Sequence, residues 1–385
     1  MTKDNRLAIV SNSGWNIYNF RAGLIRKLQE CGYSITVMAG KDAYFDRIKE
    51  LFNVELVPLL NMDETGMNPW REWKLYKELE SHYRKYRPDL IFQFTIKPNI
   101  YGSLAAKKLG IEVISNVTGL GVVAEKKHFL SPVLDQLYRY ALKSNYEVVF
   151  HNQDDLDWFR HRKMLPVGLG CVIQGSGVDT QFFKREKANT TKRSFVALMV
   201  GRMVRQKGVW EFFKACELLV EQGKSLECWM AGFYDSFHPD ALSPEEMEIM
   251  RSKAFVRLFD FQEDVRPLLN QAQVFVLPSY REGLSKAMLE AMSMELPILT
   301  TKVPGCRQAV LEGINGLLVE AKDIKGLSAA LGKFMEFDRQ KLQNMGSKSR
   351  AFVLENFDTQ HMVRGYLDLL DRIAGRQSST FGETN

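Results

Sequence analysis

Cysteine is scarce in this chain, and the spacings by which cysteine and histidine usually bind metal are missing. The 385 residues include five cysteines, an odd number without a C-x-x-C pair, which is typical of reduced thiols in a cytoplasmic protein rather than of a disulfide framework. The six histidines form no H-E-x-x-H or similar spacing, so a zinc site is not expected. We therefore predict no metal and no other cofactor.

Long apolar runs are missing as well. The first apolar run, residues 7–10, is too short for the core of a signal peptide, and no stretch approaches the roughly 20 apolar residues that cross a bilayer. The excess of positive charge is small, with 52 Lys and Arg against 46 Asp and Glu. It suits an anionic small ligand or an acidic membrane surface, and it is too small to indicate nucleic acid. The sequence thus predicts a cytoplasmic protein that meets a membrane only from the side.

The sequence does contain a repeated alternation of short apolar runs and helical segments. With 45% hydrophobic and 25% charged residues, the chain has the composition of a folded protein. Its length exceeds that at which one hydrophobic core stops growing, so two domains are expected. The apolar runs that read as buried parallel strands are residues 7–10, 34–39, 90–94, 113–115, 147–150, 195–200, 228–232, 256–258, 274–277, 298–300 and 316–319.

This alternation predicts an α/β fold with two Rossmann-like, doubly wound parallel sheets that face each other across a cleft, where ligands usually bind. We place the first domain at residues 1–183 and the second at 194–357, with the polar segment 184–193 as the linker. The apolar spacing near the C-terminus predicts a helix over about 358–375 that packs back on the first domain. Residues 376–385 are polar and predict a flexible tail.

The most informative segment follows the predicted strand that ends at Leu277. A glycine-containing loop comes next, and a helix is expected to begin near Ser285, where its free N–H groups and positive dipole end favour phosphate. Glu282 lies in the loop and Glu290 in the second turn of that helix. Two carboxylates on either side of a phosphate site fit a nucleotide sugar, with one for the ribose and one for the sugar.

Glu282-x₇-Glu290 resembles the E-x₇-E motif of retaining glycosyltransferases of family 4, which have the GT-B fold. Further segments extend the resemblance: Gly201-Arg202-x₄-Lys207-Gly208, Gly313-x-Asn315-Gly316, and Pro304-Gly305 followed by Arg307-Gln308 where the family usually has an acidic residue. The resemblance covers essentially the whole chain and is most specific over residues 198–320. It implies that Arg202 and Lys207 hold the nucleotide diphosphate, as a guanidinium fork and an ammonium group are suited to do.

The residues thus expected at a nucleotide-sugar site are Gly14, Arg202, Lys207, Glu282, Gly283, Leu284, Ser285 and Glu290, with Arg202, Lys207 and Glu282 in catalytic roles. Two loops of the first domain resemble bacterial N-acetylgalactosaminyltransferases that extend undecaprenyl-diphosphate-linked glycans. By that resemblance the acceptor-binding candidates are Asn16, Lys97, Asn116 and Thr118. Many relatives carry a histidine near the loop at 116–118, and this chain has none there. An ordinary strand–helix turn at Gly14 and a surface lysine at position 97 remain alternatives.

The resulting hypothesis is a retaining hexosyltransferase that moves a hexosyl or N-acetylhexosaminyl unit from a UDP-sugar, its co-substrate, to a polyprenyl-diphosphate-linked glycan. Such a step belongs to the assembly of bacterial capsule, lipopolysaccharide or N-glycan at the cytoplasmic face of the inner membrane. A UDP-sugar epimerase of the same fold is the alternative, and a non-catalytic scaffold is another. A dinucleotide dehydrogenase is disfavoured because no G-x-G-x-x-G follows the first strand.

Two segments could serve as a membrane contact or as part of the scaffold. Residues 125–143 mix cations with bulky apolar groups and could lie on an anionic leaflet, although a helix packed on the sheet would show the same spacing. We assign residues 70–87 to a scaffold helix with a solvated face. The acidic run Asp154-Asp155-x-Asp157 is interpreted as helix capping rather than as a metal site.

Overall fold

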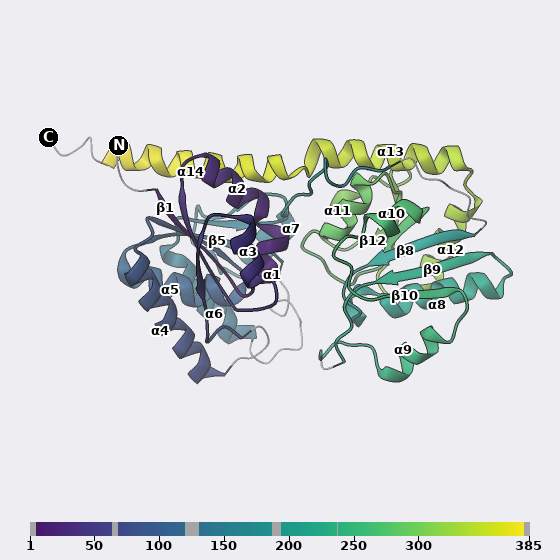
Figure 1. Cartoon of the computed structure of the whole chain (residues 1–385), viewed down its shortest axis with the longest axis horizontal. Coiled ribbons are helices and arrows are strands. Elements are labelled where there is room, and N and C mark those ends of the chain that lie inside the picture. The colour runs from purple at the N-terminus through teal and green to yellow at the C-terminus, as the bar shows by residue number, and fades with distance from the viewer. Residues whose placement is uncertain (1–4, 64–67, 120–130, 187–193, 237, 381–385) are drawn as a thin grey trace. The chain divides into compact units, whose positions relative to one another are not determined.

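The computed structural model describes residues 5–63, 68–119, 131–186, 194–236 and 238–380. The chain forms two compact units, one made of residues 1–176 and 360–385 and the other of residues 177–359. Each unit contains a single sheet whose strands all run parallel, and helices cover both faces of each sheet (Figure 1). The predicted pair of doubly wound parallel α/β sheets is confirmed.

Unit 1 has a seven-stranded sheet in the order β3-β2-β1-β4-β5-β6-β7. Its strands are β1 (Arg6–Ser11), β2 (Ser34–Ala39), β3 (Glu55–Pro58), β4 (Leu90–Phe94), β5 (Glu112–Val117), β6 (Glu147–Phe150) and β7 (Cys171–Val172). All of β4 and most of β1 and β5 are buried on both faces, which is why these strands read as continuous apolar runs.

The helices of unit 1 cover the two faces of this sheet. They are α1 (Gly14–Phe20), α2 (Ala22–Glu30), α3 (Phe45–Leu51), α4 (Pro69–Tyr86), the π-helix η1 (Pro98–Gly102), α5 (Ser103–Leu109), α6 (Ser131–Ala141), the 3₁₀ turn η3 (Leu142–Ser144), α7 (Gln153–His161) and α14 (Thr359–Thr380). One apolar core joins α2, α3 and α14 to the sheet. Two others join α4 and α5, and α6 and α7, to it.

Unit 2 has a six-stranded sheet in the order β10-β9-β8-β11-β12-β13. Its strands are β8 (Phe195–Val200), β9 (Leu226–Ala231), β10 (Val256–Phe259), β11 (Val274–Leu277), β12 (Ile298–Thr301) and β13 (Gly316–Val319). Its helices are η4 (Arg205–Lys207), α8 (Val209–Glu221), α9 (Pro244–Arg251), α10 (Arg266–Gln271), α11 (Lys286–Ser293), η5 (Arg307–Ala309), α12 (Ile324–Glu336) and α13 (Arg339–Asn356). One continuous apolar core fills this unit.

The boundary between the units lies before the segment expected from the sequence. Residues 177–183 were placed in the first domain, yet they belong to unit 2 because Val178 bonds through its backbone to Phe357 and Thr359. The hydroxyl of Thr180 donates to Asp358 at 2.5 Å. Of the expected linker 184–193, residues 187–193 lie outside the described residues, and Arg185 is held in unit 2 by the carbonyl of Glu295.

Helix α14 packs in the core of unit 1 through Met362, Tyr366, Leu369 and Ile373. It extends to Thr380, whereas the sequence predicted a helix to about 375 and then a tail. Gly375 does not end the helix, because a glycine inside a helix lowers its stability by only about 1 kcal/mol.

Candidate functional site

The strongest candidate site lies in unit 2, at the carboxyl ends of three neighbouring strands. Because β8, β11 and β12 are adjacent in the sheet, the loops that follow them meet at one edge. Two glycines allow these loops to approach one another closely. A Cβ atom on Gly208 would lie 2.2 Å from the carbonyl oxygen of Pro278, and one on Gly305 would lie 2.2 Å from the carbonyl oxygen of Gly283. Both glycines also have a positive φ, 73° and 77°, which other residues rarely adopt.

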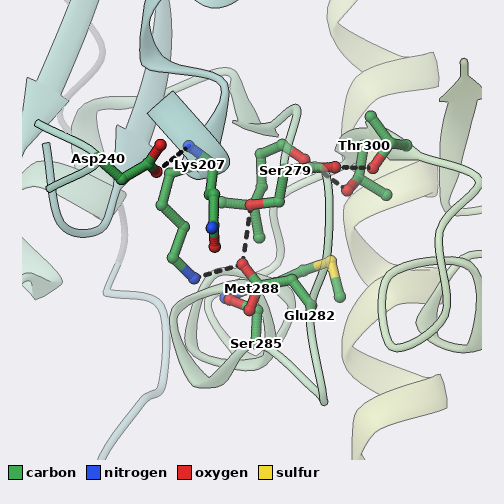
Figure 2. Close-up of polar contacts among 10 residues, drawn as sticks. Lys207, Asp240, Ser279, Glu282, Ser285, Met288 and Thr300 are labelled. Atoms are coloured by element: carbon green, nitrogen blue, oxygen red, sulfur yellow. Dashed lines mark hydrogen bonds and ion pairs between the residues drawn. The ribbon is translucent and has the colours of Figure 1, made fainter. Parts of the chain in front are cut away.

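Lys207 and Glu282 form an ion pair at this edge, and Ser279 bonds to the same carboxylate oxygen (Figure 2). The Ser279 hydroxyl donates to Oε1 of Glu282 at 2.8 Å and is fully buried. The Lys207 side chain remains 21% exposed, so its ammonium group can reach a ligand. The structure thus brings together a cation and a carboxylate that are 75 residues apart in the chain.

A further carboxylate holds the turn that presents Lys207. Asp240 accepts from the backbone N–H of Gln206 at 2.8 Å through its side chain and from that of Arg205 at 2.9 Å through its carbonyl (Figure 2). The side chain of Arg205 forms an ion pair with Glu246 at 2.6 Å. Asp240 and Ser279 could not be predicted from the sequence, because neither belongs to a recognisable spacing.

The helix after Glu282 begins where the sequence predicted. Ser285 is the N-cap of α11, and its hydroxyl accepts from the backbone N–H of Met288 at 3.4 Å. Glu290 lies in the second turn and is buried, with its Oε1 3.6 Å from Nζ of Lys286. Burial raises the pKa of Glu290 to about 7, and the charge of Lys286 opposes that increase. This carboxyl group therefore titrates close to neutral pH.

The other candidates of unit 2 differ in their contacts. The side chain of Arg202 is exposed and has no hydrogen-bond or ion-pair partner among the residues that the structure describes, so its guanidinium is available to an anion. The amide of Gln308, in the position where the family usually has an acid, lies 3.4 Å from the carbonyl of Gly283. Leu284 packs against the apolar core of the unit.

Gly14 and Asn16 lie in the first turn of α1, shortly after β1. Gly14 packs so closely on the neighbouring loop that a Cβ there would lie 2.6 Å from Oδ1 of Asp42. The first N–H groups of α1 are already bonded, that of Trp15 to Asp42 at 2.7 Å and that of Asn16 to Ser13 at 3.3 Å. Both partners lie within unit 1, so the start of α1 offers fewer donors to a phosphate than the sequence suggested.

Lys97 follows β4 and is largely buried rather than a surface lysine. Its Nζ lies 2.7 Å from Oε1 of Glu72 on α4. Thr95, two residues earlier, has a φ of 75°, which is strained for a β-branched residue, and its buried hydroxyl has no partner within the described part of the chain. The π-helix η1 begins directly after Lys97. Strained backbone and π-helical turns are concentrated at functional sites.

Asn116 and Thr118 occupy different environments. Asn116 is fully buried, and its amide donates to the carbonyl of Gln93 at 2.9 Å and accepts from the hydroxyl of Tyr366 at 2.6 Å. These contacts indicate that Asn116 joins β4, β5 and α14. Thr118 is half-buried just after β5, and residues 120–130 beyond it lie outside the described residues.

A buried polar cluster in unit 1 was not expected from the sequence. Arg21, between α1 and α2, is fully buried with its guanidinium 3.9 Å from the ring centre of Phe94, and burial lowers its pKa to about 10. His151 follows β6, and burial together with the charge of Arg21 lowers its pKa to about 3. It is therefore a neutral imidazole just after β6, the strand next to β5, which the loop at 116–118 follows.

No group of three metal-ligating side chains occurs within the parts of the chain that the structure describes. The acidic run after β6 contributes to helix α7 instead. Asn152 is the N-cap of that helix and accepts from the backbone N–H of Asp155 at 2.8 Å, and Asp154 and Asp155 lie in its first turn. This agrees with the interpretation of the run as helix capping.

Both halves of the chain match families of glycosyltransferases. Residues 194–336 match the family described as "Glycosyl transferases group 1", and residues 6–152 match the family described as "Glycosyl transferase 4-like". The first match contains the Lys207–Glu282 pair and α11. The second contains Gly14, Asn16, Lys97 and Asn116.

Several curated proteins resemble the chain at low identity. The N,N'-diacetylbacillosaminyl-diphospho-undecaprenol alpha-1,3-N-acetylgalactosaminyltransferase of Campylobacter jejuni is 26% identical over 96% of this chain and 99% of its own length. The UDP-Gal:alpha-D-GlcNAc-diphosphoundecaprenol alpha-1,3-galactosyltransferase of Escherichia coli is 27% identical over 77% of each chain.

Solved structures share the fold over nearly the whole length. A glycosyltransferase from Rickettsia africae has a TM-score of 0.78 at 17% identity and covers 97% of this chain and 99% of its own. The Anabaena protein HepE in complex with UDP-glucose has a TM-score of 0.78 at 17% identity and covers 95% of this chain and 99% of its own. These similarities confirm the GT-B architecture that the sequence motifs implied.

Proposed function

This chain belongs to the glycosyltransferases of group 1 and the 4-like type, which have the GT-B fold, and from that premise we propose that its donor is a UDP-sugar. The transferred unit is a hexosyl or N-acetylhexosaminyl group, and the anomeric configuration is retained. The acceptor is a polyprenyl-diphosphate-linked glycan at the cytoplasmic face of the inner membrane, in the assembly of a bacterial surface polysaccharide or N-glycan.

The observation that carries the donor assignment is the arrangement of Lys207, Glu282 and Ser285 in unit 2. A partly exposed ammonium group, a carboxylate held by a hydrogen bond and a helix start all lie at the carboxyl edge of adjacent parallel strands. This combination suits a diphosphate flanked by hydroxylated groups, because cations and helix N-termini stabilise phosphate while carboxylates accept from hydroxyls. HepE, which shares the fold, binds UDP-glucose.

In the reaction that we propose, Lys207 and Arg202 hold the β-phosphate and stabilise the negative charge that develops as the sugar–phosphate bond breaks. Before the donor binds, Glu282 keeps the Lys207 ammonium in place through their ion pair. With the donor bound, Glu282 accepts from sugar hydroxyls and Glu290 from the ribose. The acceptor hydroxyl attacks the same face that the diphosphate leaves, and a departing phosphate oxygen takes its proton.

The acceptor assignment rests on the relatives from Campylobacter jejuni and Escherichia coli, whose names both specify an undecaprenol-linked diphosphate sugar. Lys97 is our candidate contact for the acceptor diphosphate. It would have to exchange its ion pair with Glu72 for the ligand, or hold the ligand alongside that pair. The strained Thr95 and the π-helix beside it support our assignment of the acceptor region to this loop.

The decisive experiment is a screen of UDP-sugars with a synthetic polyprenyl-diphosphate sugar, with UDP release as the readout and NMR of the product's new anomeric centre. UDP release that requires the lipid-linked acceptor, with a retained configuration, supports the proposal. Conversion of the UDP-sugar without any acceptor would instead identify the alternative, an epimerase of the same fold. Equal turnover with free sugars would contradict the lipid-linked acceptor while leaving the donor assignment intact.

A further inference from the structure

Helix α4 exposes two large aromatic side chains near its N-terminal end. Trp70 and Trp73 are 62% and 49% exposed, and their rings stack with centroids 4.9 Å apart and planes 14° apart. Contiguous exposed aromatic surface marks an interaction site, and tryptophan is enriched where one side of the ring meets lipid and the other meets water. The Nζ of Lys74 lies 5.8 Å from the Trp70 ring centre.

The tryptophans begin a stripe that runs along the outer side of α4. The side chains at the spacing of successive turns are Trp70, Trp73, Lys74, Lys77, Arg84 and Lys85, all of them exposed, and we call this set the α4 stripe. The opposite side of the helix carries Leu75, Leu79 and Tyr83, which are fully buried in the core. One side of α4 is therefore apolar and buried, and the other side carries exposed aromatic and basic side chains.

The three carboxylates of α4 do not balance this charge on its outer side. Glu72, Glu78 and Glu80 are largely buried, with side chains 9–11% exposed. Each is already engaged: Glu72 with Lys97, Glu78 with the backbone N–H groups of residues 60 and 61, and Glu80 with Lys77, Arg84 and Lys108. The charges that reach solvent on this helix are therefore positive.

The neighbouring helices continue the same surface. On α5, Lys107 and Lys108 are exposed, and Lys108 links α5 to α4 through Glu80 at 2.8 Å. Lys107 lies 4.4 Å from the ring centre of the exposed Tyr140 on α6. The acidic side chain of α6, Asp135, is buried and paired with Arg162. These three helices are the blue ones labelled α4, α5 and α6 in Figure 1.

The helices on the other face of the same sheet lack this asymmetry. There, α2 carries exposed Arg26 and the ion pair of Lys27 with Glu30, and α3 carries exposed Asp46 and Glu50 beside Lys49, so both signs of charge are present. Charge of one sign is thus a property of the α4–α6 face and not of unit 1 as a whole. If the net charge of +6 were spread evenly over the chain, no single face would carry charge of only one sign.

We propose that the outer face of α4, α5 and α6 binds the surface of an anionic lipid bilayer, with Trp70 and Trp73 in the headgroup region and the cations over anionic lipids. This deepens the proposed function and rests on its lipid-linked acceptor. Glu72, which lies between the two tryptophans in sequence, pairs with Lys97. The aromatic end of the α4 stripe is therefore next to the loop to which we assign the acceptor diphosphate.

This proposal shares α6 with the segment considered from the sequence and adds α4 and α5 to it. Residues 125–143 were a candidate membrane contact or a helix packed on the sheet; 125–130 lie outside the described residues, and α6 and η3 pack Leu134, Tyr138 and Leu142 in the core. Residues 70–87 were expected to be a scaffold helix, and that helix carries the exposed tryptophans.

The test is co-sedimentation of the full chain with phosphatidylcholine vesicles that contain or lack phosphatidylglycerol. We expect binding only with the anionic lipid. Lys74→Glu with Lys85→Glu should lower the partition coefficient by roughly tenfold or more, since each cation near an anionic surface contributes substantially. The matched control is Lys325→Glu with Lys333→Glu on α12 of unit 2, which makes the same charge change on exposed lysines and should leave binding unchanged.

A second measurement examines the tryptophans directly. Vesicles with brominated phospholipid should quench part of the tryptophan fluorescence of the bound protein. In the variant Trp70→Phe with Trp73→Phe, this quenching should be lost. Equal binding to neutral vesicles, equal loss in the α12 control, or unchanged quenching in the tryptophan variant would each overturn the proposal. Binding to heparin or RNA with no binding to vesicles would also overturn the proposal. It would indicate a surface that binds soluble polyanions instead of a membrane.

Failure of this inference can be separated from failure of the proposed function. The α4 variants should bind UDP as the unchanged protein does and should retain turnover with a short-chain, water-soluble acceptor. Their turnover should fall only when the acceptor is embedded in vesicles. Loss of UDP binding in these variants would contradict the surface role that we assign to α4.

Discussion

Lys207 and Glu282 form an ion pair, and this pair sets how each can act. The ammonium group is held at the sheet edge by a carboxylate that Ser279 in turn holds by a hydrogen bond of 2.8 Å. A diphosphate that arrives at Lys207 therefore meets a positioned cation, which reduces the cost of ordering a flexible side chain at that moment.

Lys207→Ala should reduce transfer by roughly a hundredfold or more, because it removes one charge stabiliser of the departing diphosphate. It should leave the fold intact, since the side chain is partly exposed. Steady-state turnover and a thermal melt would measure the two effects. The matched control is Arg205→Ala, in the same 3₁₀ turn but paired with Glu246; a similar loss of turnover in both variants would argue against a specific role for Lys207.

Glu290 should make UDP binding depend on pH near neutrality. Its pKa is raised to about 7 by burial, so in the free protein it is mostly protonated below that pH. The pKa of Glu290 is higher in the folded protein than in the unfolded chain, where it is about 4.5. The contribution of Glu290 to the stability of the fold is therefore fully present below about 4.5 and is lost as the pH rises through 7. We expect UDP to bind several-fold more tightly at pH 8 than at pH 6, because the ionised form accepts better from ribose hydroxyls.

Calorimetric titration with UDP across this pH range would measure the effect. UDP itself has a phosphate ionisation near pH 6, so the comparison must be made against Glu290→Gln. That variant should bind UDP more weakly and lose the part of the pH dependence that belongs to the protein. Identical pH profiles for both proteins would remove Glu290 from the ribose site.

At the scale of elements, the site depends on how closely three loops approach one another. The loops after β8, β11 and β12 come together because Gly208 and Gly305 have no side chain where carbonyl oxygens lie. Hydrogen bonds from Thr300 to Leu277 and from Thr301 to Ser279, both of 2.6 Å, attach β12 to the end of β11. These contacts lie next to the catalytic candidates and keep them in register.

Gly208→Ala should therefore be destabilising. The left-handed φ of 73° alone should cost about 1–2 kcal/mol in a residue with a Cβ, and the clash with the backbone of Pro278 adds to it. A denaturant titration should show this loss, and UDP binding should weaken as the loop shifts. Gly201→Ala in the same motif meets no atom within 4 Å and should be nearly neutral; equal losses for the two would show that close packing is not the reason for Gly208.

At the scale of the whole molecule, the groups that we propose for the donor diphosphate are cations and a helix N-terminus. Arg202, Lys207 and the start of α11 supply positive charge at the sheet edge of unit 2, and no cluster of three metal ligands occurs within the described residues. No helix in the described part of the chain is long and apolar enough to cross a membrane. We propose the outer face of α4–α6 as the surface that contacts a lipid bilayer.

Transfer should accordingly continue in EDTA. The cationic groups of the chain already supply the charge stabilisation for which other enzymes use a divalent ion. Turnover measured with and without EDTA should agree within error, and added Mg²⁺ or Mn²⁺ should have little effect. A loss of activity in EDTA that either ion restores would contradict this prediction and would call for a metal-dependent departure of the diphosphate.

The local pattern of residues was sufficient to predict most strands and the start of α11. Buried parallel strands such as Leu90–Phe94 are apolar on both faces, and the serine at 285 is a typical N-cap, so each can be recognised from a few adjacent residues. The short strand β3, Glu55–Pro58, was missed because a glutamate and a proline interrupt its apolar pattern. The π-helix after Lys97 has no sequence signature of comparable strength.

Long-range contacts were decided by the tertiary structure alone. The sequence determined that Lys207 and Glu282 follow two different strands, but their ion pair depends on those strands being adjacent in the sheet. Likewise, the burial of Asn116 beneath Tyr366 joins residues 250 positions apart, and the exposure of Trp70 and Trp73 depends on which side of α4 packs on the sheet. Hydrophobic periodicity is a local property, whereas the partner of a charged side chain and the exposure of a ring are set by packing between distant segments.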